Sequence, residues 1–136
     1  MEPLKILEVI ADEVGTPRND GTRGSALYKV PLRLNRKPDA FEQQLLASTW
    51  DRPPLFTTKH RPGILRMVND KLILDGTTID EVEEVHVSTL KSVLEVVNRD
   101  AEQHRKRKQD EEQARLLAEK EHEDHISEVS ERIQFD

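Results

Sequence analysis

Residues 78–97, Thr-Ile-Asp-Glu-Val-Glu-Glu-Val-His-Val-Ser-Thr-Leu-Lys-Ser-Val-Leu-Glu-Val-Val, carry the clearest structural signal in the chain. Thr78 and Glu81 have the Thr-x-x-Glu spacing of a capping box, in which two side chains satisfy free N–H groups at the start of a helix. Apolar residues then recur every three or four positions as far as Val97, as on one face of a helix. The segment therefore predicts a helix that packs one face against a core.

The composition changes after this segment. No Pro or Gly follows Gly76, so nothing in the sequence forces the helix to end. Residues 99–136 hold 8 basic and 12 acidic side chains and few large apolar ones. Such a stretch buries too little apolar surface to fold alone. We therefore expect a core domain over residues 1–98, followed by a charged helical extension over residues 99–136 that is partly mobile.

The segments before this helix contain three strand signals. Residues 26–34 alternate apolar and polar side chains, which is typical of a half-buried strand. Pro31 cannot donate to a ladder, so it suggests either an edge position or an unpaired side at that residue. Two short apolar runs, at 64–68 and 71–74, are joined by Asn-Asp, which indicates a hairpin. Residues 4–14 are ambiguous, because their spacing fits a helix while their β-branched residues favour a strand. We favour the strand.

A further helix is predicted between these strands. Asp39 and Glu42 have capping-box spacing, apolar residues follow at helical intervals, and Pro53 and Pro54 end the element. The expected order is strand, strand, helix, strand, strand, helix. This order predicts an α+β fold, with a small antiparallel sheet of about four strands and helices on one face.

Composition excludes several classes of protein and site. The 136 residues include no Cys, which rules out disulfides and thiolate sites, and the net charge of −6 disfavours nucleic acid as a partner. No apolar run reaches the roughly 20 residues of a membrane span, and the first residues do not resemble a secretory signal, so we expect a cytoplasmic protein without membrane contact. No phosphate-binding loop, nucleophile elbow or metal motif occurs. We assign no catalytic residue, metal or cofactor.

Two histidines are the remaining candidates for chemistry. His86 lies on the apolar stripe of the long helix, where a hydrogen-bonded core or boundary residue is the more frequent case. His60 lies in the loop before the second pair of strands. A small-ligand site or an enzyme centred on His60 and His86 is the weakest of three functional hypotheses. His122 and His125 share a helical face, but an acidic helix matches metal-ligand spacing by chance.

Two groups of basic residues are candidate contacts to phosphate or nucleic acid: Arg105, Lys106, Arg107 and Lys108 on the extension, and Lys59 and Arg61 in the loop. The first group precedes three acidic residues at i,i+4 spacing, which favours a solvated helix. In the loop, the basic side chains can offset nearby acids, and we expect the flanking Trp50 and Phe56 in the core. A nucleic-acid-associated accessory protein is therefore the second hypothesis.

The first hypothesis is a non-enzymatic protein-interaction module of unspecified pathway. Ile126, Val129 and Ile133 recur at helical spacing near the end of the chain. They form a short amphipathic face that can fold back or join a partner. We expect the partner to be another protein, or a second copy in a weak homo-oligomer.

Overall fold

The computed structural model describes residues 1–136. Its elements are the strands β1 (Ile6–Val9), β2 (Tyr28–Leu34), β3 (Leu65–Val68) and β4 (Lys71–Thr77), the helices α1 (Ala40–Asp51), α2 (Ile79–Glu81) and α3 (Val87–Arg132), a 3₁₀ turn (Ala11–Glu13) and a π-helical turn (Val82–His86). This order confirms the α+β prediction. The chain divides into two compact units, Met1–Ala101 and Glu102–Asp136.

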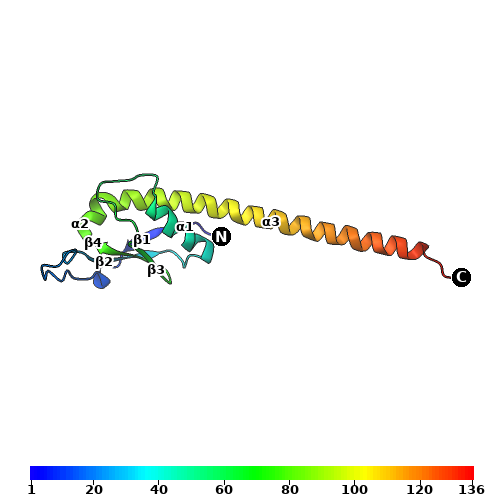
Figure 1. The fold of residues 1–136 in the computed structure, drawn as a ribbon, viewed down its shortest axis with the longest axis horizontal. Coiled ribbons are helices and arrows are strands. Elements are labelled where there is room, and N and C mark those ends of the chain that lie inside the picture. The colour runs from blue at the N-terminus through cyan, green and yellow to red at the C-terminus, as the bar shows by residue number, and fades with distance from the viewer. The chain divides into compact units, whose positions relative to one another are not determined.

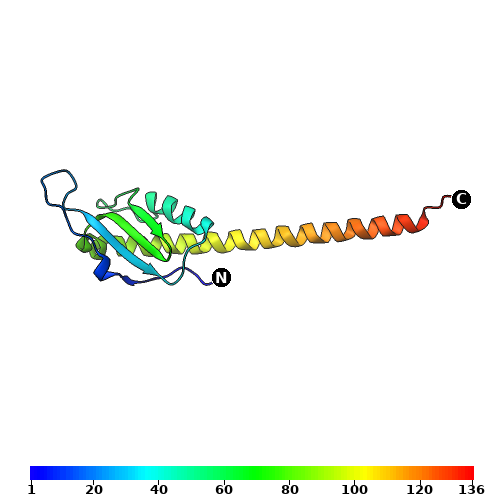
Figure 2. The ribbon, with the colours of Figure 1, turned by 90° about the horizontal axis from the view of Figure 1, so that it is seen from below.

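The first unit is a four-stranded antiparallel sheet with helices on one face. The strand order is β1-β2-β4-β3. Figures 1 and 2 show α1 and the first turns of α3 on the same face of the sheet. The inward residues of the central strands are buried beneath Trp50 of α1 and Val93 of α3; they are Val30, Leu32, Leu34, Leu72 and Leu74. Period-two alternation in the strands therefore supplies one side of the core and the helical stripes supply the other.

The ambiguous residues 4–14 contain a short strand and a 3₁₀ turn, so the preference for a strand is confirmed. Of the two alternatives for Pro31, the edge position is wrong, because β2 lies between β1 and β4. The other alternative, an unpaired side, agrees with the structure, because the pairing of β1 with β2 ends at Val9 and Leu32 and leaves Pro31 without a ladder partner in β1. The carbonyl of Pro31 accepts from the N–H of Ile10 at 3.0 Å, just beyond the end of β1. The missing N–H of Pro31 points to the same side, where the ladder has already ended, so the proline is tolerated in an interior strand.

The turn between β3 and β4 and the start of α1 follow the local sequence signals. Asn69 adopts the left-handed conformation, with φ of 55°, that a tight hairpin turn requires. Asp39 accepts from the Glu42 N–H at 2.8 Å, and Glu42 accepts from the Asp39 N–H at 2.9 Å. The predicted capping box is confirmed. Arg36 also binds both Glu42 oxygens, at 2.8 and 2.7 Å, and this pairing lets the carboxylate be buried.

The start of the long helix differs from the sequence prediction. Thr78 accepts from the Glu81 N–H at 3.1 Å, but the Glu81 side chain binds Arg61 at 2.9 Å instead of completing the capping box. A π-helical turn follows. With that turn, residues 79–132 form a continuous helical run of 54 residues.

The second unit consists of the last part of α3 and four further residues. Its surface is held by local ion pairs, such as those of Arg115 with Glu112 and Glu119. Pairs of this kind, one turn apart, support an exposed helix. Neither α3 nor any other helix combines the length and the apolarity that crossing a bilayer requires.

Candidate functional site

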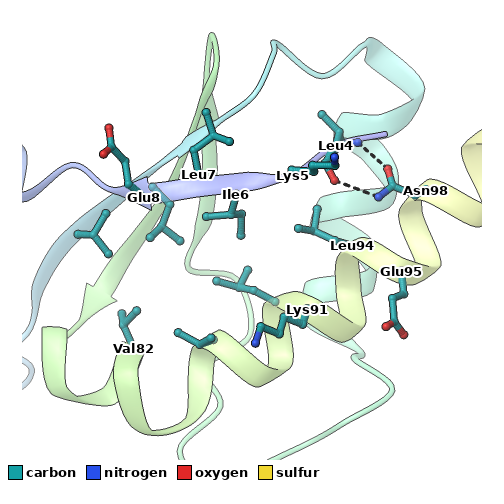
Figure 3. Close-up of a pocket in the computed structure, with 14 residues that line it drawn as sticks. Leu4, Lys5, Ile6, Leu7, Glu8, Val82, Lys91, Leu94, Glu95 and Asn98 are labelled. Carbon is teal, nitrogen blue, oxygen red and sulfur yellow. Dashed lines mark hydrogen bonds between the residues drawn. The ribbon is translucent and has the colours of Figure 1, made fainter. Parts of the chain in front are cut away.

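An apolar groove lies between β1 and the first turns of α3 in the first unit (Figure 3). Its volume is about 500 Å³. Aliphatic side chains from both elements line it; they are Leu4, Ile6, Val9, Val87, Leu90 and Leu94. A concave and largely apolar surface beside an edge strand is suited to binding.

One end of the groove is closed by a side chain that imitates a neighbouring strand. The amide of Asn98 accepts from the Leu4 N–H at 2.8 Å and donates to the Leu4 carbonyl at 3.0 Å (Figure 3). These two bonds are those that a residue in an adjacent strand would make. They anchor Leu4, two residues before β1, to α3 and leave the edge of β1 itself without such a partner.

The charged residues around the groove come in pairs of opposite sign. Lys5 and Glu8 lie on the strand, and Lys91 and Glu95 lie one helical turn apart on α3. All four are exposed. The groove is therefore apolar inside and neutral overall, with charge placed only where side chains reach water.

A second cluster, inside the core, brings the two candidate histidines together. The His60 ring lies 4.4 Å from the Trp50 ring, His86 lies 5.4 Å from it, and the two imidazoles are 6.5 Å apart. His60 Nε2 forms a 2.6 Å hydrogen bond with the Trp50 carbonyl oxygen. Both histidines are buried, and neither lines the groove. Phe56, expected in the core, is instead 63% exposed and covers only the edge of the His60 ring.

His86 is a core residue, but it lacks the hydrogen bond that was expected. Neither ring nitrogen has a hydrogen-bond partner, and a Glu81 carboxylate oxygen lies 4.0 Å from Nε2. The Glu81 carboxylate is itself held by Arg61, at 2.9 Å. Burial, followed by repulsion from His60 and Arg61, lowers the pKa of His86 to about 4. His86 is therefore neutral at pH 7. No group of three His, Cys, Asp or Glu side chains is arranged to hold a metal ion.

The two basic residues of the predicted phosphate-binding loop are both engaged by carboxylates. Lys59 binds Glu84 at 2.7 Å, and Arg61 binds Glu81 at 2.9 Å. The Glu84 carboxylate raises the pKa of Lys59 above its usual value. These pairs tie the loop to the start of the long helix and neutralise the charge that a phosphate would use.

The other predicted site residues lie in the second unit. Arg105 is partly buried, and Lys106, Arg107 and Lys108 are exposed. Ile126 and Ile133 are 50% and 52% exposed, and Val129 between them is partly buried. Two of the three residues of the predicted apolar patch, Ile126 and Val129, lie on α3, and Ile133 lies just beyond the end of the helix.

Sequence reasoning missed the groove. Its two sides come from residues 4–9 and from residues 82–98, which are far apart in the chain. The sequence did contain a signal for the groove, because the apolar runs of both segments are longer than one buried face requires. Leu7 and Val87 extend these runs, and both side chains are exposed. No family model, curated protein or solved structure matches the chain.

Proposed function

We propose that this chain is a non-enzymatic protein-interaction module whose C-terminal helix binds a partner protein or a second copy of the chain. The observation that carries the proposal is the set of aliphatic side chains at the surface of the second unit. Four of them are at least half exposed, Leu116 (51%), Leu117 (59%), Ile126 (50%) and Ile133 (52%). A helix that is otherwise strongly charged has no need of them for solubility.

The strength of such a contact can be bounded. Each aliphatic side chain contributes about 1.5–3 kcal/mol when it is fully buried. Association costs about 4–15 kcal/mol in lost freedom, so the three residues of the patch suffice only for a weak self-contact. A tight complex needs a partner that also uses the charged face of the helix.

A non-enzymatic role is supported by the burial of the only candidate catalytic side chains. His60 and His86 are both buried against Trp50, and neither lines the groove. A general base must approach the proton that it removes to within hydrogen-bond distance. Neither imidazole presents a free nitrogen to a substrate in solution.

Binding of nucleic acid is a second candidate function. It is favoured by the exposure of Lys106, Arg107 and Lys108 on consecutive positions of α3. Retention on DNA or RNA that falls steeply with salt, and that is lost in Lys106→Ala/Arg107→Ala/Lys108→Ala, would support it. The acidic residues 110–112 that follow reduce the local potential.

The interaction module is tested by sedimentation of the full chain and by recovery of partners from the native host. Ile126→Ser/Val129→Ser/Ile133→Ser removes the apolar patch, whereas Lys120→Ser/Asp124→Ser/Glu131→Ser changes the opposite helical face and serves as the control. We expect the first variant, and not the second, to lose association or a specific partner. If the first variant keeps every contact of the wild type, the proposal is wrong.

A further inference from the structure

The free edge of β1 and the groove beside it form a surface that is complementary to itself. We propose that this surface pairs, antiparallel, with the same surface of a second copy of the chain. β1 lies at the edge of the sheet and pairs only with β2. The contact lies in the first unit and is independent of the C-terminal patch.

Backbone groups of β1 are available on the free side. Lys5 exchanges hydrogen bonds with Asn35, at 2.8 and 3.0 Å, and Ile10 donates to β2 at 3.0 Å. Residues next to each other in a strand direct their N–H and C=O groups to opposite sides. Ile6 and Val9 therefore present theirs to the free edge, which an added strand can satisfy.

The sequence of the edge is complementary in charge to its own reverse. Lys5 and Glu8 enclose two apolar residues, Ile6 and Leu7. When two copies run antiparallel, each Lys5 meets the Glu8 of the other copy, either directly opposite or as a diagonal neighbour, and both positions are within reach. Glu8 has only a loose contact with Arg33, at 3.7 Å, and its side chain is 66% exposed.

The helix on the other side of the groove repeats this pattern. Lys91 and Glu95 stand on α3. The helical run is antiparallel to β1, because Asn98 lies beside Leu4 at one end of the groove and Val82 lies towards Glu8 at the other (Figure 3). The midpoint of the edge is about 8 Å from Leu4, at about 3.3 Å per residue. On a helix, the same distance of about 8 Å corresponds to about five residues. The matching point on α3, about five residues before Asn98, therefore lies between Lys91 and Glu95. One two-fold axis can therefore place both Lys–Glu pairs against those of the second copy.

The devices that usually protect an edge strand are present and make this pairing selective. β1 has four residues, and its register with β2 shifts between Ile6 and Glu8. Short length, an irregularity and charged side chains discourage pairing with an arbitrary strand. A reversed copy supplies the matching charges and covers the aliphatic groove. Because the surface is small compared with the roughly 800 Å² per partner of a stable complex, the dimer is expected to be weak.

The test is a charge swap followed by sedimentation equilibrium of the full chain over roughly 10 µM to 1 mM. Wild type is expected to self-associate. Lys5→Glu and Glu8→Lys each place like charges together and should weaken self-association roughly tenfold. An equimolar mixture of these two variants restores opposite charges and should associate as wild type does. The double variant Lys5→Glu/Glu8→Lys should also recover.

Two controls separate this contact from the others. Lys37→Glu changes the same charge at an exposed position outside the groove and should have no effect. Ile126→Ser/Val129→Ser/Ile133→Ser should leave the β1 contact intact, so failure of the C-terminal proposal is visible separately. Amide exchange at Ile6 and Val9 should slow as the concentration rises. A monomeric wild type throughout the range, or a mixture that does not recover association, overturns the inference.

Discussion

Among individual residues, His86 departs most from ordinary core packing. A neutral imidazole carries one donor and one acceptor, and both nitrogens of His86 lie buried without a partner. An unsatisfied buried polar group costs about 1–3 kcal/mol. The ring packs edge-on against Trp50 instead, so the aromatic contact partly offsets this cost.

The stability of the first unit is predicted to fall in acid because of this residue. The pKa of His86 is about 4 in the folded chain, compared with the 6.5 of an ordinary histidine in an unfolded chain. As the pH falls, the unfolded chain therefore takes up the proton before the folded chain does. The free energy of unfolding has its full value above pH 6.5 and decreases as the pH falls towards 4. The difference between the two pKa values corresponds to a decrease of roughly 3 kcal/mol in the free energy of unfolding. His60, Arg61 and Glu81 are the titratable or charged groups that face the ring.

Urea denaturation between pH 7 and pH 4 measures this effect. His86→Leu should show a shallower loss of stability than wild type over that interval. His125→Leu removes an exposed histidine and should retain the wild-type slope. Parallel curves for wild type and His86→Leu would mean that His86 does not govern the acid response.

Among the elements, α3 depends on one buried stripe in its first turns. Val93 is fully buried against the sheet, whereas Arg107, further along the same helix, is exposed. The stripe that was predicted from spacing is buried from Val82 to Val97, at Val82, His86, Thr89, Leu90, Val93 and Val97. Ile79, which the same pattern included, is 40% exposed.

Val93→Asp is predicted to unfold the first unit. An unpaired carboxylate at this position should cost several kcal/mol, which is comparable to the roughly 5–15 kcal/mol that stabilises a small domain. Arg107→Ala should leave the thermal transition unchanged. Melting followed by circular dichroism distinguishes the two, and a transition of Val93→Asp close to that of wild type would contradict the assigned helix face.

For the whole molecule, the two units differ in what holds their helical residues. In the first unit the helix packs on a sheet, and in the second it is supported by charge pairs such as Arg115 with Glu119. Packing on a core contributes most of the stability of a protein helix, whereas each surface pair contributes only about 0.2–0.5 kcal/mol. The helix is therefore stabilised much more strongly in the first unit, where it packs on the core, than in the second unit, where surface ion pairs support it.

Amide hydrogen exchange along the long helix should show this difference. Residues 79–97 are expected to exchange slowly, and residues 99–125 are expected to exchange fast when the chain is isolated. A partner that binds the extension should slow the second group and leave the first unchanged. Equal protection of both groups in the isolated chain would show that the extension is stabilised as strongly as the domain.

Short-range chemistry made much of this fold predictable from the sequence. The capping box of Asp39 and Glu42, the Asn69 turn and the period-two strand around Leu32 each depend on residues within a few positions of one another. Such signals persist whatever surrounds them, because the groups concerned satisfy each other locally. Ile126 and Ile133 in the extension could be predicted from the sequence as a candidate patch because helical spacing is also a local pattern.

Only the tertiary structure decided which of these local preferences prevailed. Glu81 leaves its capping box because Arg61, twenty residues earlier, offers it a charged partner. Pro31 lies in an interior strand because β1 ends beside it. The groove exists because Asn98 holds Leu4 across a sequence separation of 94 residues. Contacts between distant residues depend on where the whole chain places them, and a local pattern holds no information about that placement.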